Sequence, residues 1–134
     1  MNTEELNQLM KQLQGDAVVF AKNDYDLQLT SDVADISKVD TIISALKERN
    51  SASFKDKELF TLSNVFGAYV GEVVRNAVGG SWLYDTSDEQ APAVRLIIDS
   101  SDYPFASVIY QHLTGSPDVS IQDYAQNAIA RHTK

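Results

Sequence analysis

The clearest hydrophobic pattern in the chain is a helical stripe between residues 56 and 78. Its apolar side chains recur every three or four residues, as on the buried face of an α-helix: Leu59, Leu62, Phe66, Tyr69, Val70, Val73 and Ala77. Val65 and Val74 widen the stripe until most of the circumference is apolar, which is typical of a central helix. Gly79 and Gly80 then end the helix. We therefore predict a long central helix over residues 56–78.

Two glycines, Gly67 and Gly71, lie one turn apart inside this predicted helix. A glycine in a helix costs about 1 kcal/mol relative to alanine, so two of them need a compensating contact. We expect another backbone to pack closely along this line of the helix.

Shorter amphipathic helices are predicted on both sides of the central one. Residues 3–14 carry a thin apolar stripe, with Thr3 as the N-cap and Gly15 as the end of the helix. For the apolar run 17–21, a strand and a continuation of this helix both fit, because its length suits either. The remaining predicted helices cover residues 36–50, 105–113 and 120–131.

Residues 81–86 and 93–98 are predicted as strands, with Trp82 and Tyr84 on one face of the first and Val94, Leu96 and Ile98 on one face of the second. The economical pairing is an antiparallel hairpin. We expect Trp82 to be buried against the central helix, since a large aromatic side chain gains most from burial. Residues 100–104 are predicted as a loop. Helices segregated from a small antiparallel sheet define the α+β class, so we predict a single α+β domain over residues 1–134.

The composition agrees with one globular domain. The chain has 134 residues, of which 43% are hydrophobic and 22% charged, and these values exclude disordered and fibrous proteins. Its apolar runs are far shorter than the ~20 residues that cross a bilayer, and the polar N-terminus lacks the apolar core of a signal peptide. Without cysteine there is no disulfide or thiolate metal site, so we expect a cytoplasmic protein.

The net charge of −8 indicates which classes of molecule the protein can bind. An acidic surface repels phosphate backbones and anionic lipids, so we expect neither nucleic acid nor membrane binding. The same surface attracts a basic protein, although many proteins are acidic only to stay in solution. We expect a monomer or a weak homodimer that binds a basic protein.

The excess of acid lies in two segments. Residues 16–40 hold six aspartates against Lys22 and Lys38, and residues 85–102 hold five acids against Arg95. Each segment carries a charge of −4, and together they account for the whole net charge. If they meet on one face, that face is the predicted binding surface, with these contacts: Asp24, Asp26, Asp85, Asp88 and Glu89.

The chain offers few residues for catalysis or metal binding. It has two histidines, His112 and His132, and no GxSxG nucleophile motif. Asp24 and Asp26 form a DxD pair, but the glycine and distal glutamate of an EF-hand loop are missing at the required offsets, and aspartate commonly caps helices and turns. We therefore expect no catalytic residue, no metal and no cofactor.

Glu72 is the most unusual single residue, because it places a carboxylate in the most apolar helix of the chain. It is either structural, partnered by Arg75 so that it clamps the helix end to a neighbouring segment, or poised for function. Glu72, Arg75 and Trp82 are therefore candidates for either role. The alternative to a binding protein is a small hydrolase or transferase that uses Glu72 and His112, which requires both to face one open cleft.

Three stretches of the sequence carry a resemblance: ISKVDTIISAL, LSNVFGAYVGEVVRNAVGGSW and DYPFASVIYQHLTG. They resemble a group of small bacterial domains of unknown function that share a GAYxGEV helix ending in GGxW and a later Asn-Pro-Phe. The resemblance covers about residues 25–124 and is most specific from Gly67 to Trp82, while Tyr103 stands where the group favours asparagine. It implies a bacterial α+β domain without established catalytic residues and, more loosely, an immunity-like inhibitor of a basic effector or toxin.

Overall fold

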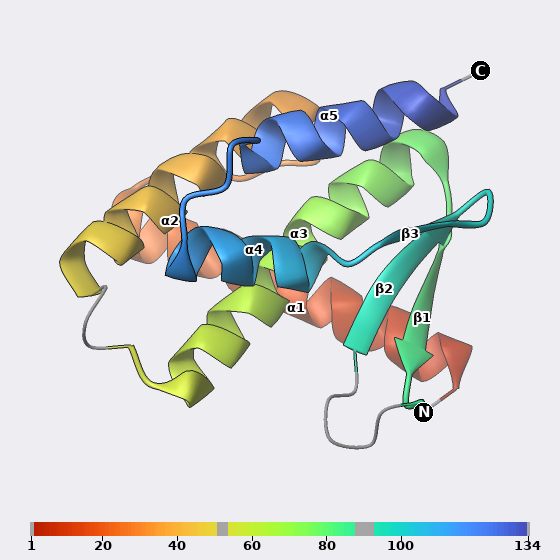
Figure 1. Ribbon diagram of the computed structural model, residues 1–134, viewed down its shortest axis with the longest axis horizontal. Helices are drawn as coiled ribbons and strands as arrows, with labels where there is room; N and C mark the ends of the chain where they lie inside the picture. The colour runs from red at the N-terminus through yellow and green to blue at the C-terminus, as the bar shows by residue number, and fades with distance from the viewer. Residues whose placement is uncertain (1, 51–53, 88–92, 134) are drawn as a thin grey trace.

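The computed structural model describes residues 2–50, 54–87 and 93–133. Within them, five α-helices pack on a three-stranded antiparallel sheet (Figure 1), which confirms the predicted α+β fold. The helices are α1 (Thr3–Tyr25), α2 (Ile36–Asn50), α3 (Asp56–Val78), α4 (Phe105–Thr114) and α5 (Ile121–His132). The strands are β1 (Ser81–Asp85), β2 (Ala93–Ile98) and β3 (Ser101–Tyr103), and a 3-10 turn covers Val33–Asp35. No helix in these ranges is long and apolar enough to cross a membrane.

The central helix α3 has the predicted bounds and makes its largest contacts with α1 and α4. Its apolar stripe is fully buried at Phe66, Tyr69, Val70 and Val73. Burying a side chain of this size stabilises the fold by about 1.5–3 kcal/mol. The periodicity of the stripe therefore identified the element that organises the core.

The two glycines of α3 admit close neighbours, but of two different kinds. A Cβ atom at Gly67 would lie 2.7 Å from the backbone Cα of Ala106 in α4, so the expected backbone contact is present there. A Cβ atom at Gly71 would lie 2.6 Å from Cζ2 of Trp82, so the neighbour at this position is a side chain and the expectation of a backbone is wrong. Gly71 provides the space into which the indole fits.

The predicted hairpin forms, with Trp82 opposite Leu96 in an antiparallel register between β1 and β2. Trp82 is 5% exposed, which confirms its predicted burial. The predicted loop at 100–104 is wrong, because residues 101–103 form β3 beside β2. Asp99 and Ser100 connect β2 to β3 with φ angles of +48° and +70°, the left-handed values that a tight two-residue hairpin turn requires. Neither is a glycine, so the sequence lacked the usual signal for this turn.

Helix α1 is longer than predicted, because it continues through Gly15 and ends at Tyr25. The glycine costs about 1 kcal/mol, and the burial of Ala17 and Ala21, which pack the second half of the helix against the core, outweighs this cost. The N-cap is Asn2 rather than Thr3, since the Asn2 side chain accepts a 2.8 Å hydrogen bond from the backbone N–H of Glu5. The apolar run 17–21 is therefore a helical continuation.

Helix α5 is joined to α2 by a carboxylate that caps it. Asp40 of α2 accepts hydrogen bonds from the backbone N–H groups of Ile121 (2.9 Å) and Gln122 (3.0 Å). Lys47, further along α2, donates to the carbonyl oxygen of Gly115 and to the hydroxyl of Ser116. These polar contacts fix the chain between α4 and α5 against α2.

Candidate functional site

Glu72 is a buried carboxylate that interacts with two side chains, those of Trp82 and Arg75. It is 3% exposed, and its Oε1 accepts a 2.7 Å hydrogen bond from the indole Nε1–H of Trp82. The Arg75 guanidinium lies 3.6 Å from Oε2 and donates through Nε to the carbonyl oxygen of Gly80 at 3.2 Å. Buried charges persist where they are paired and hydrogen-bonded in this way. Glu72, Arg75 and Trp82 thus join the end of α3 to β1.

His112 is held by two backbone carbonyl groups. Its Nδ1 lies 2.9 Å from the carbonyl oxygen of Val108, and its Nε2 lies 2.9 Å from that of Val119. A cleft of about 190 Å³ beside it is lined by α2, α4 and the connection to α5, with Asp40 and Lys47 at its wall. Glu72 does not line this cleft. The two residues of the enzyme hypothesis therefore do not meet there.

His132, which the sequence pattern did not single out, sits between an aspartate and a tyrosine. Its Nε2 lies 2.7 Å from the hydroxyl oxygen of Tyr103, and its Nδ1 lies 3.2 Å from Oδ2 of Asp99. The His132 side chain is only 6% exposed, and its ring meets that of Tyr103 edge to face. None of the three residues lines the cleft beside His112. The arrangement attaches the last turn of α5 to the β2–β3 turn.

This contact also closes an aromatic cluster over the sheet. The rings of Tyr103 and Phe105 stack at 6.1 Å, and Tyr124 of α5 packs edge to face against both. Burial in this cluster, with a smaller contribution from Tyr103, raises the pKa of the Tyr124 phenol. The cluster buries aromatic area and connects α4 and α5 to the sheet.

Several acids of the first acidic segment have structural partners. Asp26 forms an exposed 3.1 Å ion pair with Lys22, and Asp32 caps the 3-10 turn. Asp35 accepts hydrogen bonds from the hydroxyl and backbone N–H of Thr30 and pairs with Lys38 at 2.9 Å. These contacts, the Thr30 hydroxyl first among them, lower the pKa of Asp35. Together with Asp40, these carboxylates stabilise the segment that contains them.

In the second acidic segment, a single arginine forms ion pairs with two aspartates. Arg95 of β2 pairs with Asp85 at 2.5 Å and with Asp102 at 3.2 Å. Hydrogen bonds from Ser87, and then the charge of Arg95, lower the pKa of Asp85. The other two predicted contacts of this segment, Asp88 and Glu89, lie outside the described residues.

The predicted contacts Asp24 and Asp26 lie toward one end of α1, and β1, which carries Asp85, lies toward the other. Helix α1 has 23 residues and is therefore about 34 Å long at 1.5 Å per residue. β1 packs against α1 near its N-terminal end, at the right of Figure 1, while the C-terminal end of α1, which carries Asp24 and precedes Asp26, lies behind α2 at the left. Asp24 and Asp26 are therefore separated from Asp85 by most of the length of α1.

In the described part of the chain, we consider two surfaces that combine polar groups with accessible apolar groups. One is the edge of the sheet at β1, where Leu83 is 43% and Tyr84 is 39% exposed. β1 pairs only with β2 among the described strands, so its other edge has unpaired backbone groups. The other is a cavity at the far end of α1 with Asp24 at its rim. Sequence reasoning missed this cavity because its lining comes from three helices.

No family model, curated protein or solved structure matches this chain. The resemblance to small bacterial domains therefore stays a prediction. Its most specific part has a structural explanation: Gly67 admits α4, Gly71 admits the indole of Trp82, and Glu72 accepts the hydrogen bond from that indole.

Proposed function

We propose that the protein is a binding protein that associates with a basic partner protein through the β1 end of the molecule. The proposed contacts on β1 are Leu83, Tyr84 and Asp85, whose side chains lie on alternate faces of the strand. Glu4 and Glu5 lie in the first turn of α1, the helix end nearest β1 in Figure 1. The observation that carries the proposal is an edge strand with two exposed large apolar side chains. Such a strand offers backbone hydrogen bonds to an added strand and apolar anchors for its side chains.

The charge of this surface favours a basic partner. Asp85 and Asp102 share the single guanidinium of Arg95, so their cluster keeps a negative charge. Glu4 and Glu5 add two carboxylates where α1 begins. Asp88 and Glu89 follow β1 in the sequence and complete the set of contacts that we propose. The negative electrostatic potential of this surface raises the association rate of a cationic protein.

The specific form that we propose is an immunity-like inhibitor that covers a basic effector or toxin in the bacterial cytoplasm. The enzyme alternative has less support. The Glu72 carboxylate is occupied by Trp82 and Arg75, and both ring nitrogens of His112 lie against carbonyl oxygens. A general base or nucleophile needs a group that can reach the substrate, and neither residue offers one.

The test is a binding assay against the products of the neighbouring genes at low and high salt. Leu83→Lys places a cation on the proposed surface, and Val19→Lys makes the same change at a 57% exposed position in the second half of α1. We expect Leu83→Lys to weaken binding at least tenfold and Val19→Lys to leave it unchanged. Raising the salt concentration should slow association, because exposed charges are screened over about 8 Å at physiological ionic strength.

Three results would contradict the proposal. The first is a partner that is acidic and binds independently of salt. The second is full binding by Leu83→Lys, and the third is an equal loss with Val19→Lys. Unfolding midpoints of both variants establish that each is folded before binding is compared.

A further inference from the structure

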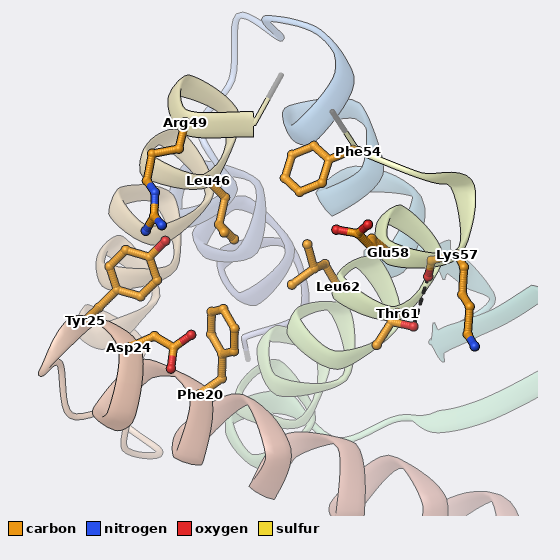
Figure 2. Close-up of a pocket in the computed structure, with 10 residues that line it drawn as sticks. All are labelled: Phe20, Asp24, Tyr25, Leu46, Arg49, Phe54, Lys57, Glu58, Thr61 and Leu62. Carbon is orange, nitrogen blue, oxygen red and sulfur yellow. Dashed lines mark hydrogen bonds between the residues drawn. The ribbon is translucent and has the colours of Figure 1, made fainter. Parts of the chain in front are cut away.

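An open cavity of about 440 Å³ lies at the end of the molecule opposite the β1 surface (Figure 2). The last turns of α1 and α2 and the first turns of α3 surround it, together with Phe54, which precedes α3. Its volume falls within the range of ~300–1,000 Å³ that small-molecule sites occupy. The cavity is therefore large enough for a small organic ligand.

The floor of this cavity is apolar and firmly packed. Phe20, Leu46 and Leu62 form it, and the ring of Phe54 stands at its edge in Figure 2. Phe20 packs edge to face against the buried Phe66, with ring centroids 5.7 Å apart. A floor of this kind accepts an apolar group without rearrangement, which lowers the entropic cost of binding.

The rim of the cavity carries charges of both signs. Asp24, Arg49 and Glu58 line it, and none of them has an ion pair with any residue in the described ranges. In Figure 2 the carboxylates of Asp24 and Glu58 face the cavity, whereas the side chain of Lys57 points away from it. The lining thus has two cations, of which Lys57 is directed outward, and two anions around an apolar floor.

Tyr25 adds an independent sign of a missing partner. Its hydroxyl group is buried and has no hydrogen-bond partner among the described residues. Figure 2 shows this hydroxyl directed toward the side chain of Arg49. Buried polar atoms are nearly always hydrogen-bonded. Because this hydroxyl has no accessible surface, a ligand oxygen becomes its partner only when the Arg49 side chain moves to admit it.

We propose that this cavity binds a small zwitterion with an apolar side chain, of the class of free aromatic or branched amino acids. The ligand's carboxylate accepts hydrogen bonds from the Arg49 guanidinium and the Tyr25 hydroxyl, the pairing that guanidinium groups favour. Its ammonium group lies against Asp24, and its side chain covers Phe20 and Leu62. This site is separate from the β1 surface, so it does not depend on the proposed protein partner.

Three probes of one shape test each part of the site. L-Phenylalanine carries both charges, 2-phenylethylamine lacks the carboxylate, and 3-phenylpropanoate lacks the ammonium group. Isothermal titration of the full chain should give the strongest binding with L-phenylalanine and at least tenfold weaker binding with either analogue. Equal binding of one analogue, or no binding of L-phenylalanine at ~10 mM, the weak end of specific affinities, would overturn the proposal.

Two variants that each remove one positive charge distinguish a direct contact with the ligand from an effect of net charge. Arg49→Met should weaken L-phenylalanine and 3-phenylpropanoate at least tenfold and leave 2-phenylethylamine unchanged. Lys11→Met, at an exposed position in the first half of α1 that does not line the cavity, should bind all three probes as the parent does. Equal losses in the two variants, or an Arg49→Met variant that is folded and binds like the parent, would contradict the assignment of the carboxylate to Arg49.

Discussion

The indole N–H of Trp82 donates a 2.7 Å hydrogen bond to the buried carboxylate of Glu72, and this bond connects the sheet to the central helix. The indole ring lies over Gly71, one residue before Glu72, at a distance that excludes any side chain there. A single aromatic residue in β1 is thus positioned by a glycine and a carboxylate that are adjacent in α3. Substitutions at these positions should therefore affect the stability of the whole domain.

Loss of the acceptor at Glu72 should be more damaging than loss of its charge. Glu72→Gln keeps an oxygen that can accept from the Trp82 indole, while Glu72→Leu leaves a buried donor unpaired. A buried unpaired donor costs about 1–3 kcal/mol, so we expect Glu72→Leu to be less stable than Glu72→Gln by about 2 kcal/mol. Urea unfolding followed by circular dichroism measures the difference, and equal stabilities would show that this bond contributes nothing.

Gly71 should tolerate no side chain, whereas Gly15 should benefit from one. A Cβ atom at Gly71 would lie 2.6 Å from Cζ2 of Trp82, so Gly71→Ala should destabilise the fold by about 3 kcal/mol, and Gly71→Leu by more. A Cβ atom at Gly15 in α1 would have no such neighbour within 4 Å, so Gly15→Ala should stabilise by about 1 kcal/mol. Urea midpoints that move in the same direction for both alanine variants would refute this.

The cap that Asp40 provides to α5 should contribute measurably to stability. Asp40→Ala removes the acceptor of two backbone N–H groups and should cost about 1–2 kcal/mol. Asp16→Ala is a matched control, because Asp16 is exposed and has no hydrogen bond or ion pair in the described part of the chain. A loss of stability as large in Asp16→Ala would mean that net charge, and not capping, is responsible.

The stabilisation from Asp35 should depend on pH. Hydrogen bonds from Thr30 and then Lys38 lower the pKa of this carboxyl below its usual 3.8 in the folded protein. Its contribution is therefore complete above pH 3.8 and is lost as the pH falls through the lower, folded-state pKa. Asp35→Asn should be less stable than the parent at pH 7, and the gap should narrow steadily below about pH 4.

Asp118→Asn is the control for this pH dependence. Asp118 is exposed and has no hydrogen bond or ion pair among the described residues. Urea midpoints of the parent and both variants from about pH 7 to pH 3 give the comparison. A gap for Asp35→Asn that stays constant over this range would show that protonation of Asp35 is not its cause.

Local sequence patterns predicted those elements in which the pattern of apolar residues itself sets the face that packs against the core. The stripe of α3 is visible in the sequence because this helix buries one face of its own, and β2 likewise buries Leu96 and Ile98 on one face. The extent of α1 was not visible, since the burial of Ala17 and Ala21 by other elements outweighs the local preference of Gly15. The turn at Asp99 and Ser100 was missed because its left-handed backbone occurs without glycine.

The candidate sites likewise divide into features that a local sequence pattern indicates and features that depend on other elements of the fold. Glu72 could be selected because a carboxylate in an apolar stripe violates a local pattern, and the burial of Trp82 against the same helix was predicted. No local pattern, however, shows that the two side chains are hydrogen-bonded to each other. The contact of His132 with Asp99 joins residues 33 positions apart and depends on β3. The cavity beside Tyr25 needs three helix ends, so only their arrangement in space reveals it.

The cap from Asp40 to α5 has a consequence for the order of folding. Its two hydrogen bonds join Asp40 to Ile121 and to Gln122, which are separated from it by 81 and 82 positions in the sequence. A loop of that length must close before the cap can form. The start of α5 should therefore acquire protection from amide hydrogen exchange after α3 does, and it should open before α3 under native conditions. When it opens, α2 and α3 lose their contacts with α5, while the packing of Gly67 against Ala106 should remain. We therefore expect α5 to exchange as a separate cooperative unit of the domain.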